Sequence, residues 1–338
     1  MKKNLLNMSL NELKEAFKSI NEPAYRAEQA YSWFYQKYVT DLDQMSNFSQ
    51  KLRDKISQNF EIQLPEVFKV AESQSDGSQK FLLKTHDDKL IEAILMPTEK
   101  RTTLCVSCMI GCPLKCKFCA TGSQIGFVRK LDQSEILGQV IQASRKERIT
   151  NIVFMGMGEP LLNLKNVDQA IQILLNKDSF GISRSKVTLS TAGVTENLSN
   201  FINKYRINLA ISLHFTTDEQ RSEFMPINKK YSINELITEL KKIELAKRDY
   251  ITIEYIMIKD VNDSLDDARR LIKLLNGLKI KINLIPYNPT TSFVAQSSTE
   301  EQIDIFAKYL RSKSVMVTVR RSLGKETEGA CGQFALKN

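Results

Sequence analysis

Hydrophobic residues are spaced as in helices over about the first 60 residues of the chain. Leu13 and Phe17 lie one helical turn apart, and the same spacing returns in two later segments of this part. Ser9 followed by Glu12 has the form of a capping box, in which each side chain accepts a hydrogen bond from the other residue's backbone N–H. We therefore predict a helical domain with three helices over residues 1–62.

After residue 62 the pattern changes to short apolar runs, which is typical of β-strands. Turn-forming Ser, Asp and Gly residues separate the runs. The runs are residues 67–70, 80–83 and 90–95. Because short turns join strands that run in opposite directions, we predict a short antiparallel β extension over residues 63–100.

From residue 101 onward, strand-like runs alternate with helical segments. The predicted strands are residues 103–107, 152–155, 186–190, 209–213, 251–257 and 280–285. The helical segments include residues 132–144, 166–175, 233–245 and 265–275. Such alternation requires a parallel sheet. Six units are fewer than the eight that close a TIM barrel. We predict an α/β fold, a partial (β/α)6 barrel over residues 101–338, with ligands at the carboxyl ends of its strands.

Composition narrows the class of protein. The 338 residues include 48 Lys and Arg against 39 Asp and Glu, for a net charge of +9. This excess favours a polyanionic partner, although ordinary surface charge is an alternative. The two histidines, His86 and His214, leave little for a histidine-rich metal site. With neither a signal-peptide pattern nor an apolar run of about 20 residues, we expect a cytoplasmic protein away from the membrane.

Three cysteines follow the first predicted barrel strand with the spacing C-x3-C-x2-C, namely Cys112, Cys116 and Cys119. Three thiolates can hold three corners of a cubane [4Fe-4S] cluster and leave one iron open, and an open position characterises a catalytic metal. The spacing resembles that of radical S-adenosylmethionine (SAM) enzymes. In these enzymes the open iron binds SAM and the cluster supplies the electron that cleaves it.

Cys105 and Cys108 form a further C-x2-C pair, which makes a structural zinc site the alternative. A zinc ribbon usually separates its two pairs by about 15–20 residues, and Cys108 and Cys116 are too close for that. A disulfide framework is not expected in a long chain with reduced thiols. The iron–sulfur interpretation is favoured.

Other polar residues stand where predicted strands end. Gly158 and Glu159 follow the second strand, and a glycine there allows close approach of a ligand while the carboxylate can accept from an ammonium group. The other candidates for binding SAM are Ser190, Ser212, Leu213, His214 and Asn288. A single polar residue after a strand is more often a cap or a turn former, so the prediction depends on their convergence at one rim.

Cys331 lies far along the chain from the other cysteines, between Gly329 and Gly332. A single cysteine is usually an inert buried side chain. The flanking glycines favour a mobile loop instead, and a flexible thiol near an open cluster is a candidate nucleophile.

Several segments together resemble the RlmN/Cfr family, radical SAM enzymes that methylate an aromatic carbon of adenosine in 23S ribosomal RNA. The segments are residues 104–107, 112–122, 155–163, 187–191, 225–228 and 330–333. Residues 25–29 resemble the RNA-binding extension of that family. The resemblance implies a radical SAM barrel with one [4Fe-4S] cluster, SAM, and rRNA and tRNA substrates. It also implies a monomer that takes electrons from a donor such as flavodoxin or ferredoxin.

The resemblance also implies a mechanism that consumes two SAM molecules per turnover. The first SAM methylates Cys331, and the radical formed from the second takes a hydrogen from the new S-methyl group. The methylene radical adds to the adenine ring, a carboxylate at Glu92 takes the ring proton, and Cys105 attacks Cys331 to release the product through a transient disulfide. For Glu92, the polar face of a strand is the alternative. Cys108 stands where the family typically has serine, and the sequence assigns it no role.

Residues 158–163, 252–255 and 281–286 resemble the group that methylates C2 of adenosine more than the Cfr-like group. The Cfr-like group methylates C8 and confers resistance to ribosome-targeting antibiotics. We predict C2 methylation, with C8 as the alternative. Two other functions stay open: a radical SAM activating enzyme that leaves a radical on a partner protein, and a zinc-bearing RNA-binding protein without enzymatic activity.

Overall fold

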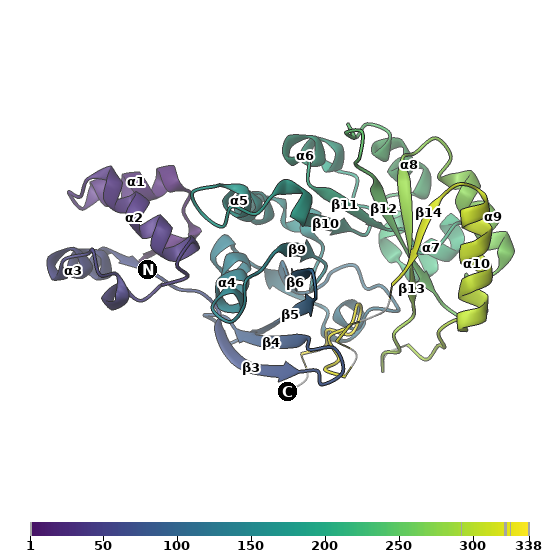
Figure 1. Cartoon of the computed structure of the whole chain (residues 1–338), viewed down its shortest axis with the longest axis horizontal. Coiled ribbons are helices and arrows are strands. Elements are labelled where there is room, and N and C mark those ends of the chain that lie inside the picture. The colour runs from purple at the N-terminus through teal and green to yellow at the C-terminus, as the bar shows by residue number, and fades with distance from the viewer. Residues whose placement is uncertain (1, 292, 321–322, 325, 337–338) are drawn as a thin grey trace.

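A ten-stranded sheet carries the main body of the protein, and three N-terminal helices form a lobe at one end (Figure 1). The computed structural model describes residues 2–291, 293–320, 323–324 and 326–336. In spatial order the strands are β14 (Met316–Val319), β13 (Ile280–Pro286), β12 (Ile251–Met257), β11 (Asn208–Ser212), β10 (Val187–Thr191), β9 (Asn151–Phe154), β6 (Arg101–Cys105), β5 (Leu90–Thr98), β4 (Gln79–Lys84) and β3 (Glu66–Glu72).

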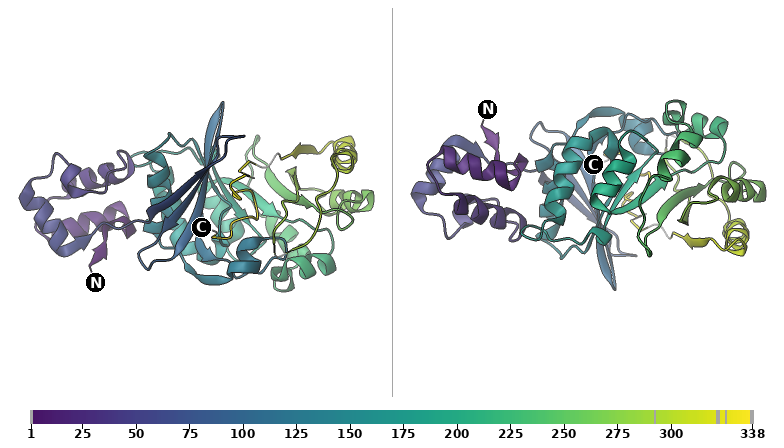
Figure 2. Two further views of the ribbon diagram at one scale, coloured as in Figure 1. Left: turned by 90° about the horizontal axis from the view of Figure 1, so that it is seen from below. Right: turned by 90° about the horizontal axis from the view of Figure 1, so that it is seen from above.

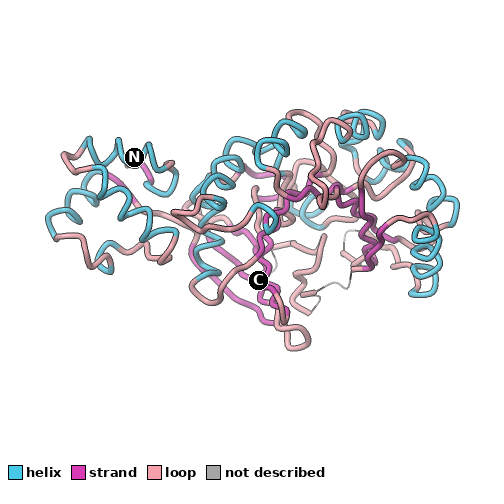
Figure 3. The backbone as a smooth tube through the Cα atoms, turned by 45° about the horizontal axis from the view of Figure 1, so that its top comes forward, coloured by secondary structure: helices cyan, strands magenta, loops and turns pink. Residues whose placement is uncertain are grey.

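In this spatial order, the strands from β14 to β6 run parallel to one another and form the partial barrel. Figure 3 shows their curvature, with helices covering the outer side. The helices are α4 (Gln133–Ser144), α5 (Leu164–Leu175), α6 (Leu198–Tyr205), α7 (Asp218–Phe224), α8 (Ile233–Leu240), α9 (Leu265–Leu274) and α10 (Glu300–Ser312). The α/β fold and all six predicted parallel strands are confirmed, with ends shifted by a few residues.

The prediction differs from the structure at four helices and, within the ten-stranded sheet, at one strand. The parallel strand β14 was missed, because its four residues, with Met316 and Thr318 exposed, carry too little apolar pattern. The helix α10 that precedes it was also missed. Helices α6 and α7 were also missed. The prediction of one helix over 233–245 is wrong at its end. Helix α8 stops at Leu240, and the Ile243 N–H donates to the Leu240 carbonyl in a turn that brings Ile243 into the core.

The antiparallel strands β3, β4 and β5 continue the same sheet. Strand β5 pairs antiparallel with β6, the first strand of the barrel. The predicted β extension is therefore an edge of the main sheet, and the boundary proposed at residue 100 stays a prediction. This continuity places residues of β5 beside those that follow β6.

The N-terminal lobe consists of α1 (Leu10–Ser19), α2 (Ala24–Tyr35) and α3 (Gln50–Asn59), closed by pairing of β1 (Lys3–Asn4) with β2 (Phe60–Glu61). The predicted capping box of Ser9 and Glu12 is present. The lobe contacts the barrel where Gln133 Nε2 donates to the Leu6 carbonyl at 2.6 Å. Figure 2 shows the lobe at one end in both views. None of the described helices has both the length and the apolar character needed to cross a bilayer.

After β14 the chain returns across the open side of the barrel, as the yellow segment in Figure 2 shows. Its contacts begin at the turn between β3 and β4, where the Gly324 N–H donates to Asp76 Oδ2 at 2.8 Å. They continue at the barrel rim, where Ala120 N–H donates to the Gly332 carbonyl at 2.8 Å. Thr121 Oγ1 donates to the Phe334 carbonyl at 2.9 Å. The segment that carries Cys331 thus lies against the cysteine loop.

Candidate active site

The three cysteines lie on a loop that is closed at its base by the hairpin of β7 (Met109–Gly111) and β8 (Phe127–Lys130). The Cys112 N–H donates to the Gly126 carbonyl at 2.7 Å across this base. Gly111 has φ +74°, and a Cβ at this position would lie 1.7 Å from the Gly126 oxygen. Only glycine fits there, so the base of the cysteine loop depends on Gly111.

The thiols of Cys112, Cys116 and Cys119 are free and line one pocket. Burial raises the pKa of Cys112 to about 12, and the negative charge of Cys119 adds to that shift. Burial also raises the pKa of Cys116 well above its usual value, with the two other thiols adding to it. Three thiols that repel one another as anions at a pocket wall are suited to a bound cation, so the residues fit a three-thiolate iron–sulfur cluster.

Cys108 belongs to the hydrophobic core and not to this pocket. Its side chain is 2% exposed, and its Sγ donates to the Met157 carbonyl at 3.6 Å. The side chain is therefore used in packing beside the strand ends. A zinc site built from the pair of Cys105 and Cys108 receives no support from this arrangement.

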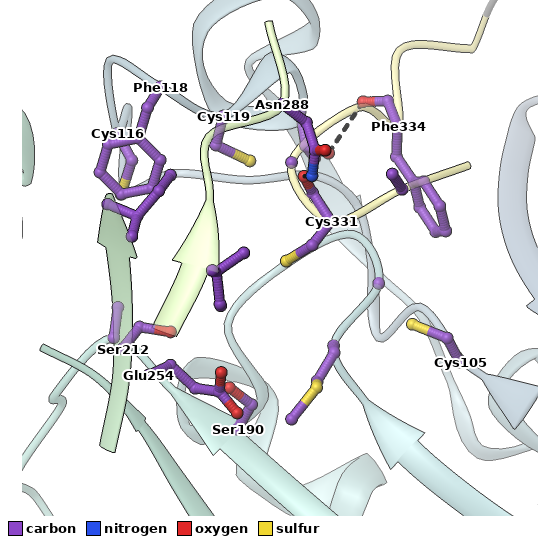
Figure 4. A pocket seen from close by; sticks show the side chains of 18 of the residues that line it. Cys105, Cys116, Phe118, Cys119, Ser190, Ser212, Glu254, Asn288, Cys331 and Phe334 are labelled. Carbon is purple, nitrogen blue, oxygen red and sulfur yellow. Dashed lines mark hydrogen bonds between the residues drawn. The ribbon is translucent and has the colours of Figure 1, made fainter. Parts of the chain in front are cut away.

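Strand ends place polar side chains around the pocket. Figure 4 shows Ser190 from β10, Ser212 from β11 and Asn288 after β13 around the same space as Cys119 and Cys331. Because parallel strands end at one edge of the sheet, residues about 100 positions apart in the sequence meet there. Of the residues predicted to bind SAM, six line the pocket, namely Gly158, Glu159, Ser190, Ser212, His214 and Asn288.

Leu213 is the exception. Its side chain is 1% exposed and packs in the core, so only its backbone faces neighbouring polar groups. The Leu213 carbonyl accepts a hydrogen bond from Arg221 Nε at 3.1 Å.

Glu159 is a buried carboxylate held by two backbone amides. Its Oε2 accepts from the Ala192 N–H at 2.7 Å, and its Oε1 accepts from the Leu161 N–H at 3.2 Å. Burial raises the pKa of Glu159 to about 7, and these amides oppose the shift. The carboxylate is thus fixed in orientation and faces a pocket in which an ammonium group would stabilise its charge.

His214 is held as a neutral imidazole. Its Nδ1 accepts a hydrogen bond from the Ile256 N–H at 3.2 Å. Burial lowers the pKa of His214 to about 3, and the positive charge of Arg221 adds to this shift. Because Nδ1 is an acceptor, the proton of the neutral ring is on Nε2, which makes that atom a donor.

Cys331 and Cys105 line the same pocket as the three cysteines (Figure 4). Cys331 is exposed toward the pocket, and Asn288 Nδ2 donates to its carbonyl at 3.2 Å. The surrounding protein raises the pKa of the Cys331 thiol by excluding bulk water, while Arg320 opposes the shift. Burial raises the pKa of Cys105 to about 12. Five cysteines therefore surround one space, two of them outside the cysteine loop.

Glu92 lies on β5, outside the residues that line the pocket. Its side chain is fully buried and pairs with Lys80, with Nζ and Oε1 3.0 Å apart. Burial raises the pKa of Glu92, while Lys80 and the backbone amides of Ala335 and Leu336 oppose the shift. The carboxylate is thus covered by the C-terminal segment.

Two charged pocket residues were not predicted. Glu254 on β12 is 5% exposed and accepts from Asn283 Nδ2 at 2.8 Å. The sequence did contain a signal for Glu254, because it is a lone acidic residue within an apolar strand. Arg320 follows the missed strand β14, and its positive charge lowers the pKa of both Cys105 and Cys331 against the effect of burial. No local pattern indicated Arg320.

Two family models match the chain. Residues 3–62 match the ribosomal RNA large subunit methyltransferase N-terminal domain, and residues 106–275 match the radical SAM superfamily. The dual-specificity RNA methyltransferase RlmN of Geotalea uraniireducens is 41% identical over 333 residues, which cover 98% of this chain and 96% of that protein. This chain belongs to the RlmN family of radical SAM RNA methyltransferases.

A second relative and a solved structure agree with this assignment. The probable dual-specificity RNA methyltransferase RlmN of Pseudothermotoga lettingae is 41% identical over 338 residues, covering 99% of this chain and 98% of that protein. The crystal structure of a radical SAM methyltransferase from Sphaerobacter thermophilus is similar with a TM-score of 0.94. It is 34% identical and covers 99% of this chain and 100% of that one. Membership of the family confirms the predicted fold and implies a [4Fe-4S] cluster and SAM as cofactors.

Proposed function

We propose that this enzyme methylates C2 of an adenosine in 23S rRNA, and C2 of the adenosine next to the anticodon in tRNA. One observation carries methylation through a cysteine-bound methyl group: Cys331 and Cys105, from opposite ends of the main domain, open into the pocket lined by Cys112, Cys116 and Cys119. An enzyme that transferred a methyl group directly would need neither thiol. The preference for C2 comes from the resemblance of residues 158–163, 252–255 and 281–286 to the C2 group. C8 methylation of the Cfr-like kind is the second candidate.

The rim of the pocket supplies the groups that hold SAM. Glu159 accepts from the ammonium group of SAM, and Ser190, Ser212 and Asn288 bind its ribose or carboxylate. The neutral His214 donates from Nε2. Cys112, Cys116 and Cys119 would hold the cluster, which would supply the electron for cleavage of SAM to methionine and a 5′-deoxyadenosyl radical.

Cys331 carries the methyl group. Its thiolate attacks the methyl carbon of a first SAM, so that a new S–CH3 bond forms and S-adenosylhomocysteine leaves. A hydrogen atom is then removed from the S-methyl group by the radical formed from a second SAM, so each turnover uses two SAM molecules. The resulting methylene group bonds to C2 of adenine. Arg320 stabilises the Cys331 thiolate in the first step, because its charge opposes the effect of burial.

Cys105 completes the reaction. Its thiolate bonds to the sulfur of Cys331, which forms a Cys105–Cys331 disulfide and breaks the bond between that sulfur and the methylene carbon. The released carbon takes up a proton to become the methyl group, and the unpaired electron left by radical addition would return to the oxidised cluster. Glu92 takes the proton from C2. For this step the C-terminal residues 335–336 must withdraw from Glu92, since their amides lie against its carboxylate. Burial raises the pKa of Glu92, so its carboxylate is the stronger base as long as the substrate that replaces residues 335–336 keeps bulk water away from it.

The remaining features of the proposal concern partners. The net charge of +9 and the N-terminal lobe support binding of rRNA and tRNA. The disulfide must be reduced after each turnover, which suits an enzyme in the cytoplasm, where thiols are kept reduced. The enzyme would act as a monomer. A small electron carrier such as flavodoxin or ferredoxin would reduce the cluster.

The test is anaerobic reconstitution with iron and sulfide, followed by mass spectrometry of nucleosides from 23S rRNA and tRNA after reaction with SAM and reductant. We expect 2-methyladenosine, which is absent with Cys331→Ala and retained with Cys108→Ala. Cys105→Ala should stop after carbon–carbon bond formation and leave RNA attached to the protein. 8-Methyladenosine would support the Cfr-like function, and SAM cleavage without any methylated adenosine would contradict both.

A further inference from the structure

Arg221 on α7 is a buried cation without a hydrogen-bonded carboxylate in the part of the chain that the structure describes. Arg221 is 0% exposed to solvent. Its guanidinium donates to three backbone carbonyls: Nε to Leu213 at 3.1 Å, and Nη2 to Ala192 at 2.5 Å and to Ser212 at 3.3 Å. Its Nη1 donates to Asn228 Oδ1 at 2.8 Å, and Asn228 Nδ2 in turn donates to Asp218 Oδ1 at 2.8 Å, so the Asp218 carboxylate reaches Arg221 only through an amide. A buried charge is costly unless an opposite charge balances it. The position of Arg221 therefore calls for an explanation beyond packing.

The three carbonyls belong to the ends of two adjacent barrel strands. Ala192 directly follows β10, and its own N–H donates to Glu159 Oε2 at 2.7 Å. Ser212 ends β11. Arg221 thus joins the strand end that orients Glu159 to the strand end that carries Ser212. Gly193 leaves room for this contact, since a Cβ there would lie 3.0 Å from Arg221 Nη2 and its φ is +99°.

The helix that carries Arg221 also packs on the cysteine loop. The Lys117 N–H donates to the Phe224 carbonyl at 2.9 Å, and Phe224 shares a hydrophobic cluster with Cys116 and Phe118. Burial lowers the pKa of Arg221 to about 10, whereas the charges of Cys116 and Asp218 oppose that shift. The guanidinium therefore stays protonated at neutral pH, on a helix that packs directly against the loop of Cys116.

We propose that Arg221 is a positioning residue of the radical SAM site, which clamps the ends of β10 and β11 in the SAM-binding geometry and balances the charge of the cluster. A cubane cluster held by three thiolates is anionic, and reduction adds one more negative charge. A fixed cation beside it stabilises the reduced form, since net charge is one of the terms that set cluster potentials. This inference rests on the proposed assignment of the cluster and SAM sites.

Two substitutions separate the clamp from the charge. Arg221→Met removes both the charge and the fork of donors. Arg221→Lys keeps the charge, but its compact ammonium cannot reach three carbonyls in the geometry of a guanidinium. Arg269→Met is the matched control, because Arg269 is an exposed arginine on α9 that pairs with Asp266.

Two quantities are measured on reconstituted enzyme with equal iron content. One is the reduction equilibrium of the cluster, followed by electron paramagnetic resonance during a redox titration. The other is the Kd for SAM from calorimetry under anaerobic conditions. For Arg221→Met we expect the reduction equilibrium constant to fall about tenfold, which corresponds to about 59 mV for one electron. We also expect the SAM Kd to rise about tenfold.

Arg221→Lys should keep the reduction equilibrium within about twofold of wild type and still bind SAM about tenfold more weakly. Wild-type values of both quantities in Arg221→Met would overturn the proposal, as would equal losses of both in Arg221→Lys. If Arg221→Met does not fold, Arg221→Lys decides: it should bind SAM more weakly while its reduction equilibrium stays near the wild-type value. A wild-type enzyme that binds neither cluster nor SAM would instead refute the proposed function, so the two failures are distinguishable.

Discussion

The buried ion pair between Lys80 and Glu92 permits a quantitative prediction for Lys80→Met. The two charged atoms are 3.0 Å apart, and the side chains are 8% and 0% exposed. Methionine nearly matches the length of lysine and keeps its packing, so the substitution chiefly removes the charge. The result is a carboxylate without its ion-pair partner in the interior.

The expected loss of stability follows from the distance and the burial. At an effective dielectric constant of about 20, the attraction over 3.0 Å is about 5.5 kcal/mol. Part of this attraction only offsets the hydration that both ions lose in the folded state. Removing one partner of a buried pair therefore costs about 3–5 kcal/mol in free energy of unfolding.

This loss should depend on pH in a defined direction. Burial raises the pKa of Glu92 in the folded state. The stability that comes from the protonated carboxyl is therefore fully present below the unfolded pKa and is lost as pH rises through the folded pKa. Lys80→Met raises the folded pKa further. The variant should be more destabilised at about pH 8.5 than at about pH 5, because protonation of Glu92 at falling pH removes the unpaired charge.

Urea unfolding followed by circular dichroism at both pH values measures this difference. Lys69→Met on the neighbouring strand β3 is the control, because Lys69 is exposed. The double variant Lys80→Met/Glu92→Gln should recover most of the loss. A loss below about 1 kcal/mol at the higher pH, the value typical of surface pairs, would refute the reasoning.

Three further predictions concern the cysteine loop and the RNA. Gly111→Ala should abolish cluster loading, because its Cβ would lie 1.7 Å from the Gly126 oxygen; iron and sulfide analysis tests this. Gly277→Ala, at φ +80° with nothing within 4 Å, should load normally, and equal loading of both variants would contradict the steric argument. Cys108→Ala should lower the stability by about 1 kcal/mol and leave methylation within about twofold, and loss of methylation would assign this thiol a role in the reaction. RNA affinity should fall steeply between about 0.05 and 0.2 M salt. A flat response would show that the net charge of +9 does not contribute to RNA binding.

Local patterns in the sequence predicted the parts of the protein whose residues lie close together in the chain. The capping box at Ser9 and the alternation of strands and helices depend on neighbours a few residues apart. The missed strand β14 and helix α7 are short, and short elements are stabilised by their neighbours in space more than by their own pattern.

The candidate site shows the same division. The spacing of Cys112, Cys116 and Cys119 predicted the cluster loop directly, because three ligands of one cluster can lie within a single short loop. Ser190 and Asn288 were predicted from a rule about strand ends, which needed the fold class only. Glu92 was identified by resemblance alone, and its pairing with Lys80 depends on the antiparallel register of β4 and β5.

The sequence by itself determined the spacing of the three candidate cluster ligands, the parallel barrel and the family, since each depends on spacing within a short segment or on the order of segments. Only the tertiary structure decided that Cys331 and Cys105 share a pocket with the cluster loop and that the C-terminal segment covers Glu92. It also decided that Arg221 is buried among three strand-end carbonyls. The physical reason is that burial and charge balance depend on which distant segments the sheet brings together, and residue spacing along the chain carries no information about that distance.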